Sequence, residues 1–321
     1  MRYIINDCTA PCFNQAFEQV LFDEYTKDDI LLLWRNTPCV VFGRYQNVFA
    51  EVNIVHAKNA GVDIIRRDTG GGAVYHDLGN INFSLMSQSH GIGVSYDEYL
   101  TKAVCALNKI GVPAHTNKTC DIAIDGKKIS GNAQRQTKTR VLCHGTLLFN
   151  TDLNKLNEFL PDKTKSFSSK AIASNRSEVA NISEYVSNFS SAAEFMYAFA
   201  DAFNAQQMNA DNELLSKADQ IASEKYRSWE WTIGKNPAFS RTIQSDNIII
   251  SFASKNGIIT ELDINIDDKR LSVSDIFIGK RLEENEIYKQ LKENLNNKCA
   301  DILSELIFDC KTEELIYEKR D

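Results

Sequence analysis

Three consecutive glycines in the segment RRDTGGGAVYHDLGN, residues 66–80, constrain this chain more than any other feature. The stretch 62–67 before them has strand character, and residues 81–86 after them predict another strand. Because glycine has no side chain, the backbone N–H groups of this triplet can approach an anionic or extended ligand, and Arg66 or Arg67 can clamp a phosphate or carboxylate. A mobile surface loop is the alternative, since glycine supplies ordinary turns as well.

The periodicity of apolar residues elsewhere predicts a mixture of helices and strands. Apolar residues at helical spacing between Phe13 and Leu21 are followed by two short apolar runs, 30–34 and 39–42. A further amphipathic helix over residues 96–110 stops at a glycine, as many helices do. Residues 190–229 are also helical in character, and helical segments close the chain from position 283 onward. The fold class we expect is α+β.

Two dipeptides that end in glycine predict tight hairpins. Asp125-Gly126 separates the strand-like segments 121–124 and 127–130, and Asn256-Gly257 separates 248–254 from 258–266. A chain of 321 residues exceeds the usual size of one domain. Because turn residues interrupt the sequence near Pro237, we expect one domain over residues 1–240 and a second over residues 246–321.

The composition excludes several classes of protein. A net charge of −7 does not support a broad electrostatic grip on nucleic acid. The chain has no apolar window of about 18 residues that could span a membrane, and its first residues do not resemble a secretory signal. Its eight cysteines form no CxxC pair, which favours reduced thiols over zinc sites. We therefore expect a cytoplasmic protein without nucleic-acid or membrane partners.

Two further segments carry residues suited to chemistry. In CDIAIDGKKISGNAQ, residues 120–134, Lys128 lies just after the predicted hairpin turn and Gly131 follows, so that an ammonium could be held rigidly over a pocket. A lysine after a turn is more commonly a solvated surface group. In HGTLLFN, residues 144–150, His144 enters a predicted buried strand, where a structural role is the simpler interpretation.

Taken together, these three segments in this order and spacing resemble the lipoate-protein ligase family. The similarity extends to PCFNQAF, LLLWRNTPCVVFGRYQN, SEVANISEY and KYRSWEWTIGKNPAF, so it covers nearly the whole chain. The resemblance implies a large mixed-sheet catalytic domain of the biotin/lipoyl ligase type, followed by a small α/β accessory domain. It also implies that ATP converts lipoate to lipoyl-AMP, from which the lipoyl group passes to a lysine of a partner protein.

The resemblance further implies the roles of individual residues. Lys128 corresponds to the catalytic lysine. The implied lipoate-binding residues are Arg66, Arg67, Gly70, Gly71, Gly72, Ala73, His76 and Asn80. The implied adenylate-binding residues are Gly71, Tyr75, Asn80, Lys128, Ser130, Gly131, His144, Lys170, Ser174, Arg176 and Val179. The segment KAIASNRSEV, residues 170–179, looks like the adenylate-binding loop of the family, although Ala171 replaces a usual glycine and Glu178 a usual arginine.

The implied chemistry also requires a cofactor and a partner. Asp121 is suggested as a ligand of Mg²⁺, which would accompany ATP. The implied acceptors are lipoyl domains of 2-oxoacid dehydrogenase complexes and the glycine cleavage H protein, and we expect the ligase to act as a monomer. Arg135, Lys138 and Arg140 are candidates for docking an acidic acceptor, or are simply solvated charges. Octanoate is expected to be accepted as well, because apolar pockets discriminate weakly by chain length.

Two other functions stay open from the sequence. A related acyltransferase would move octanoyl or lipoyl groups through a cysteine without ATP, with Cys143 as its nucleophile, although this residue is expected before a strand and without a base partner. The substitutions Ala171 and Glu178 also allow a non-catalytic lipoate carrier. Biotin ligase is disfavoured, because its GRGRxGR and KWPND signatures are absent from the sequence.

Overall fold

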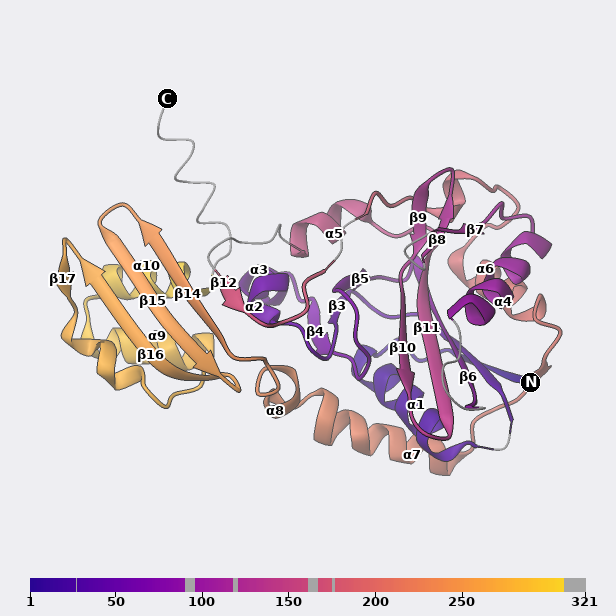
Figure 1. The fold of residues 1–321 in the computed structure, drawn as a ribbon, viewed down its shortest axis with the longest axis horizontal. Helices are drawn as coiled ribbons and strands as arrows, with labels where there is room; N and C mark the ends of the chain where they lie inside the picture. The colour runs from indigo at the N-terminus through magenta and orange to yellow at the C-terminus, as the bar shows by residue number, and fades with distance from the viewer. Residues whose placement is uncertain (27, 90–95, 118–120, 161–166, 175–176, 309–321) are drawn as a thin grey trace. The chain divides into compact units, whose positions relative to one another are not determined.

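The structure is a computed structural model that describes residues 1–26, 28–89, 96–117, 121–160, 167–174 and 177–308 (Figure 1). It divides into two compact units, each assembled from separate stretches of chain. The first comprises residues 1–44, 65–156 and 175–228, and the second comprises residues 45–64, 157–174 and 229–321. The sequential domain bounds 1–240 and 246–321 stay a prediction. No helix of the described segments is long and apolar enough to cross a bilayer.

A six-stranded mixed sheet forms the frame of the first unit, in the order β10-β11-β6-β2-β1-β13. Strands β13, β1 and β2 pair in parallel, whereas β2, β6, β11 and β10 pair antiparallel. Both β2 and β11 are buried along their whole length, as expected for central strands. The strands are β1 (Arg2–Asn6), β2 (Ile30–Trp34), β6 (Asn80–Gln88), β10 (Asn132–Gln136), β11 (Arg140–Leu148) and β13 (Gln206–Gln207).

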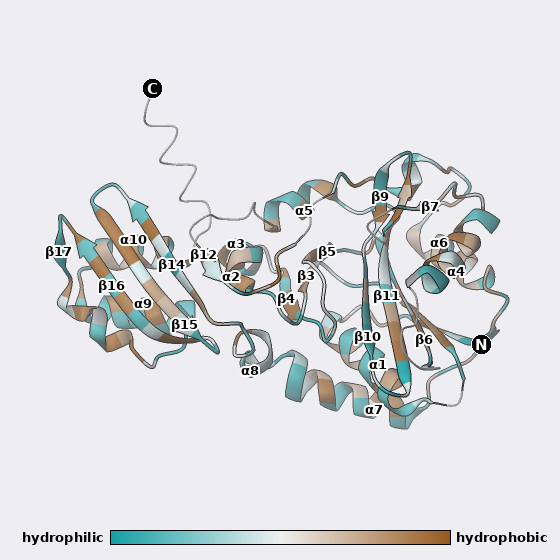
Figure 2. Cartoon of the chain, viewed as in Figure 1, coloured by the Kyte–Doolittle hydropathy of each residue, from teal (hydrophilic) through white to brown (hydrophobic). Residues whose placement is uncertain are grey.

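Helices cover the sheet of the first unit with different chemistry on each face. Helices α4 (Tyr96–Lys109) and α6 (Ala192–Asp201) pack on one face through an aromatic core, in which Phe83 of β6 lies 5.5 Å from both Tyr99 and Phe199, ring centre to ring centre. Helix α1 (Pro11–Glu24) covers the opposite face with a buried side that combines apolar residues and Glu18, whose carboxylate bonds to Ser84 and His144. Figure 2 shows hydrophobic residues along β11, whereas the edge strand β10 is mostly hydrophilic.

Two smaller three-stranded sheets of the chain carry the predicted motifs. One has the order β4-β3-β5, formed by β4 (Asp63–Arg66), β3 (Cys39–Phe42) and β5 (Val74–His76). The other comprises β7 (His115–Thr116), β8 (Ile122–Ile124) and β9 (Lys127–Ser130). The predicted β8–β9 hairpin is confirmed, with Asp125 at φ 48° and Gly126 at φ 81°, the left-handed conformations that such a turn needs.

A five-stranded sheet, β12-β14-β15-β16-β17, belongs to the second unit. The predicted hairpin at Asn256-Gly257 joins β15 to β16 and is confirmed by positive φ angles at both residues. The ring of Phe239 contacts those of Phe49, Phe167 and Phe252. The strands are β12 (Phe167–Ser169), β14 (Phe239–Ser245), β15 (Ile248–Lys255), β16 (Ile258–Ile266) and β17 (Lys269–Arg270); the helices include α2 (Val48–Glu51), α3 (Ile54–Asn59), α8 (Trp229–Thr232), α9 (Glu284–Asn294) and α10 (Asn297–Phe308).

The helical expectation for residues 190–229 is wrong in one part. After α6 the chain leaves the helical conformation at Asn204, which has φ 52°, and β13 then pairs in parallel with β1. Helix α7 (Asn212–Ile221) and the π-helical turn η2 (Ala222–Tyr226) follow. The pair Gln206-Gln207 has no intrinsic strand preference, so backbone pairing with an existing sheet edge decides its conformation.

Candidate active site

The triglycine loop, residues 67–73, is folded around the side chain of Arg67. The Nε of Arg67 donates to the Thr69 hydroxyl and to the Gly70 carbonyl, both at 3.0 Å, and Nη2 donates to the Gly72 carbonyl at 2.8 Å. Its Nη1 reaches the carbonyl of Val41 in β3 at 3.2 Å. Arg67 is only 6% exposed. This guanidinium therefore shapes the loop.

Glycine is required where the triglycine loop packs against the end of β3. Gly71 has φ 87°, and a Cβ there would lie 2.8 Å from Nη2 of Arg67. A Cβ on Gly43 would lie 2.1 Å from the carbonyl oxygen of Gly71. Any side chain at Gly43 would consequently push the loop away from β3. Gly43 was not singled out by the sequence analysis.

Arg66 also acts through the backbone of its neighbours. Its side chain is fully buried, lies 4.5 Å from the centre of the Phe42 ring and donates to the Arg44 carbonyl at 2.8 Å. Burial lowers the pKa of Arg66 to about 10, so the group stays charged at neutral pH. Both arginines are thus engaged by the protein itself, and a direct clamp on a ligand stays a prediction.

Lys128 projects from the β8–β9 hairpin and is held by one carboxylate. Its ammonium lies 3.0 Å from Oδ1 of Asp121, and its side chain is 21% exposed. A Cβ on Gly131 would lie 3.4 Å from this Nζ, so Gly131 backs the ammonium closely. Ala133, two positions further along β10, lies 3.5 Å from the position of a Cβ on Gly71. Gly131, just before β10, thus lies beside the lysine, and Ala133, near the start of β10, lies beside the triglycine loop.

The end of the predicted adenylate-binding loop runs beside Lys128. The backbone N–H of Lys128 donates to the Glu178 carbonyl at 2.9 Å, and the backbone carbonyl of Lys128 accepts from the N–H of Ala180 at 3.0 Å. Lys128 and Val179 thereby form a parallel β-bridge. Glu178, in place of the usual arginine, forms an ion pair at 3.0 Å with Lys127. The structure therefore brings Val179 to the catalytic hairpin.

The remaining predicted adenylate residues are distributed differently. Ser130 is buried, and its hydroxyl donates to the side-chain oxygen of Asn132 at 3.3 Å. Tyr75 of β5 is also buried and pairs with Val40 of β3. Lys170 is exposed and belongs, with Ser174, to the second unit. The hydroxyl of Ser174 contacts Glu51 and Gln46 of that unit. Arg176 lies outside the described residues.

His144 connects the sheet, helix α1 and the triglycine loop. Its Nδ1 lies 2.8 Å from the Glu18 carboxylate, which also accepts from the hydroxyl of Ser84. Because a carboxylate can only accept, Nδ1 of His144 carries a proton, and Nε2 shares a hydrogen bond of 2.8 Å with the Thr69 hydroxyl. This chain of bonds fixes the loop to the face of the sheet that α1 covers.

The same face carries buried polar atoms without a protein partner. His76 receives a hydrogen bond from Asn36 on Nδ1 at 3.0 Å, whereas its Nε2 has no partner among the described residues. Burial, with Arg67 and His144 nearby, lowers the pKa of His76 to about 3, so its ring is neutral and Nε2 bears a hydrogen to donate. Buried polar groups normally find partners, so a cluster of unpaired ones indicates a ligand site. Further unpaired atoms on this face are Gln15 Oε1, Trp34 Nε1, Asn80 Oδ1, Asn82 Nδ2 and the guanidinium nitrogens of Arg140, which lies over the Phe22 ring of α1.

The donors for a metal ion are few. The described residues contain no cluster of three or more His, Cys, Asp or Glu side chains that could enclose an ion. Asp121 supplies a single buried carboxylate beside Lys128. Mg²⁺ in nucleotide sites is commonly held by one or two carboxylates together with phosphates and water, so this donor set fits Mg²⁺ brought by ATP and does not fit a permanent metal site.

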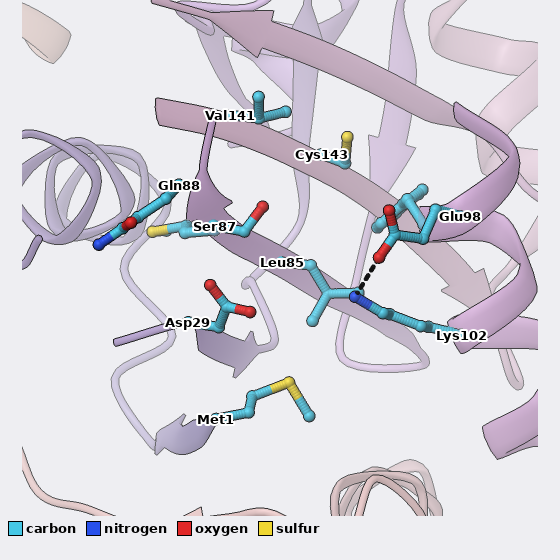
Figure 3. Close-up of a pocket in the computed structure, with 11 residues that line it drawn as sticks. Met1, Asp29, Leu85, Ser87, Gln88, Glu98, Lys102, Val141 and Cys143 are labelled. Carbon is cyan, nitrogen blue, oxygen red and sulfur yellow. Dashed lines mark ion pairs between the residues drawn. The ribbon is translucent and has the colours of Figure 1, made fainter. Parts of the chain in front are cut away.

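Cys143 lies inside β11, not before a strand as expected, and faces away from His144. It borders a cavity of about 110 Å³ against α4 (Figure 3). Burial raises the pKa of its thiol to about 12, which leaves essentially no thiolate at neutral pH. The side chain of this cysteine is thus separated from the polar face by the sheet. The cavity is lined by Met1, Asp29, Leu85, Met86, Ser87, Gln88, Glu98, Tyr99, Lys102, Val141 and Cys143.

The predicted docking cations are mostly engaged inside the protein. Arg140 is only 4% exposed, so it is wrong as a docking residue, and Arg135 forms ion pairs with Asp68 and Asp23. Lys138 alone of the three is exposed. Long charged side chains beside aromatic rings bury readily, and both guanidiniums lie over the ring of Phe22.

Comparison with known proteins identifies the family. Residues 10–204 match the lipoyl protein ligase A/B catalytic domain. The lipoate-protein ligase LplJ of Bacillus subtilis is 32% identical over 95% of this chain and 97% of its own length. A putative lipoate protein ligase from T. acidophilum, solved with lipoic acid, has a TM-score of 0.63 and 26% identity over 73% of this chain and 98% of that one.

Two further solved structures are similar. A lipoate-protein ligase A with bound ATP has a TM-score of 0.63 and 26% identity, covering 72% of this chain and 97% of that chain. An archaeal bi-partite ligase, described with its E2 lipoyl domain, has a TM-score of 0.63 and 25% identity over 72% of this chain and 95% of that chain. The extent of these matches, over a shared catalytic core, shows that the chain belongs to the lipoate-protein ligase family.

Proposed function

We propose that this protein activates lipoate with ATP to form lipoyl-AMP and transfers the lipoyl group to a lysine of a lipoyl domain. The observation that carries the proposal is that one short segment contacts both parts of the site: the partly exposed Lys128 ammonium lies beside Gly131, and the preshaped triglycine loop lies beside Ala133. The comparisons support the reaction class, since the similar proteins are lipoate-protein ligases described with lipoic acid, with ATP or with a lipoyl domain.

In the first step, a lipoate carboxylate oxygen attacks the α-phosphorus of ATP, and the bond to the leaving pyrophosphate breaks. Two anions must approach each other, and the ammonium of Lys128 can bridge the carboxylate and the α-phosphate. Asp121, which pairs with this ammonium at 3.0 Å, keeps it oriented until the substrates arrive. Mg²⁺, held in part by Asp121, would supply charge neutralisation on the triphosphate.

In the second step, the neutral amine of the acceptor lysine attacks the lipoyl carbonyl carbon. A C–N bond forms, the bond to AMP breaks, and the amine releases a proton to solvent. The same Lys128 ammonium stabilises the negative charge that develops on the carbonyl oxygen. The loop carbonyls are already bound to Arg67, so little reorganisation is needed during the reaction.

The residue roles belong to this proposal. Gly70 to Ala73, His76 and Asn80 would contact lipoate, and Arg66 and Arg67 would act by holding the loop. Val179 and Gly131 would lie beside the adenylate. The H protein as a second acceptor, a monomeric state and a cytoplasmic location stay predictions.

The cysteine-dependent transferase finds little support in the site. Cys143 points away from His144, and burial raises its thiol pKa to about 12, so the nucleophilic thiolate is not populated. The non-catalytic carrier is disfavoured by the intact hairpin and by the ion pair that keeps Lys128 poised.

One experiment separates these functions. The protein is incubated with ATP, Mg²⁺, lipoate and an apo lipoyl domain, and the acceptor is analysed by intact mass. We expect the mass of one lipoyl group to be added, together with lipoate-dependent exchange of pyrophosphate into ATP. Transfer without ATP would favour the transferase, and binding of lipoate without exchange would favour the carrier.

A further inference from the structure

One carboxylate in the triglycine loop is surrounded by three cations. Asp68 follows Arg67 directly, and its carboxylate lies 2.8 Å from Nη1 of Arg44, 2.9 Å from Nη1 of Arg135 and 3.6 Å from Nζ of Lys225. The Asp68 side chain is 12% exposed. We call these four residues the Asp68 cluster. Of the four, only Arg135 was assigned a role in the sequence analysis, as a candidate for docking an acidic acceptor.

The three cations of the Asp68 cluster come from separate elements. Arg44 follows β3, and its N–H also donates to the Thr69 carbonyl at 2.8 Å. Arg135 belongs to β10 and lies 4.8 Å from the centre of the Phe22 ring in α1. Lys225 belongs to η2 and donates to Gln19 of α1 at 2.8 Å. Asp68 thereby ties the loop to β3, β10 and η2 at once.

The geometry distinguishes this cluster from ordinary surface pairs. Exposed ion pairs contribute little, because water screens them and both side chains must be ordered. Here the carboxylate is mostly buried, and Arg135 and Lys225 each make a second contact with α1, so the cost of ordering these two side chains is shared. Removing the carboxylate would leave three like charges facing one another. The loop would then lose a restraint at the residue between Arg67 and the glycines.

We propose that Asp68 is a positioning residue for lipoate binding, which holds the triglycine loop in its binding conformation through Arg44, Arg135 and Lys225. This inference rests on the proposed function, because it assumes that the loop receives lipoate. Asp68 acts on the loop and not on the reacting atoms, so its loss weakens lipoate binding and spares the chemical step.

The test is the variant Asp68→Asn, which keeps the shape and removes the charge. We expect its KM for lipoate in pyrophosphate exchange to rise about tenfold, equivalent to ~1.4 kcal/mol, with kcat within about twofold of the wild type. Asp68→Glu should restore part of the affinity. The matched control is Asp28→Asn, which removes a carboxylate paired with Arg2 at 3.1 Å in the same unit and should leave both constants unchanged.

A second variant tests whether the cluster acts as a network. Arg44→Gln should raise the KM for lipoate in the wild-type background and add nothing to it in the Asp68→Asn background, because the two side chains act through one contact. Independent effects that multiply would contradict a shared restraint. A rise in the KM for the acceptor alone would also overturn the proposal and would indicate a docking surface instead.

Hydrogen exchange gives a readout that does not depend on activity. In Asp68→Asn, we expect the amides of residues 69–72 to exchange at least about tenfold faster, while those of β6 and β11 keep their protection. Unchanged loop exchange together with an unchanged KM for lipoate would overturn the inference and leave the ligase function intact. A wild-type protein without lipoate-dependent exchange would instead reject the proposed function.

Discussion

The two faces of the six-stranded sheet differ in chemistry although the same strands build both. On the α4 face, β6 and β11 present Phe83, Cys143 and Leu147, which pack into a continuous apolar and aromatic core. On the α1 face, one residue along each strand, they present Ser84 and His144, which bond to Glu18. Because successive side chains of a strand point to opposite faces, one buried strand can contribute both to the apolar core and to the polar face.

From this difference we propose that the α1 face holds substrate. Apart from the cavity beside Cys143, the α4 face gains stability from close packing, so a ligand among its aromatic side chains would have to displace them. The α1 face instead keeps buried polar atoms unpaired, including Nε2 of His76 and Nδ2 of Asn82, which costs stability unless a ligand or water satisfies them. We therefore expect substitutions on the α1 face to affect lipoate handling and those on the α4 face to affect folding.

The largest loss of activity that we expect from a substitution on the α1 face is that of Glu18→Gln. The carboxylate orients His144, which holds Thr69 of the triglycine loop, and hydrogen bonds to charged groups contribute about 1.5–3 kcal/mol each. We expect kcat/KM for lipoate to fall roughly 10- to 100-fold, measured by pyrophosphate exchange. Glu24→Gln, on the exposed part of the same helix, is the control. Equal losses in both variants would remove the distinction between the faces.

A smaller effect concerns His76 and pH. The pKa of His76 is about 3 in the folded protein and about 6.5 when unfolded, so the unfolded state binds more protons between these values. The free energy of unfolding should therefore be fully retained above about pH 6.5 and fall as pH drops toward 3, by at most ~1.4 kcal/mol per pH unit from this group. Denaturant unfolding of wild type and His76→Gln at pH 5 and 7.5 measures it. A pH slope that is unchanged in the variant would contradict a neutral buried imidazole.

The smallest expected effect is that of Cys143→Ala. Loss of one buried sulfur on the α4 face should lower stability by about 1 kcal/mol and leave lipoate transfer within about twofold of the wild type. Intact-mass assays of the acceptor measure the transfer. Abolished turnover with retained thermal stability would revive a cysteine nucleophile and reverse the roles assigned to the two faces.

Local signals in the sequence predicted the turns and the motif segments. Positive φ at Asp125, Gly126 and Gly71 follows from residue type, because only a few residues tolerate that conformation. The β-bridge between Lys128 and Val179 could not be predicted from local signals, because the two residues lie far apart along the chain. A motif can name both segments, but only the fold brings them together.

Other features depend on partners that no local pattern identifies. Glu18 lies among apolar residues at helical spacing, and a charge at such a position was a signal that the sequence analysis passed over. Arg66 and Arg67 were expected to face a ligand, whereas Arg66 donates to the carbonyl of Arg44, and Arg67 donates to carbonyls of the loop and of β3. Sequence shows that a charge is present, and only the structure shows what satisfies it.

The most direct test concerns Lys128 in both half-reactions. We expect Lys128→Ala to lower lipoate-dependent pyrophosphate exchange and lipoyl transfer from preformed lipoyl-AMP by at least about 10²- to 10³-fold each, the usual cost of losing a preorganised donor. The neighbouring Lys127→Ala removes an exposed ion pair with Glu178 and should keep near wild-type rates. Near-normal rates for Lys128→Ala in either half-reaction would contradict the claim that the Lys128 ammonium serves both half-reactions.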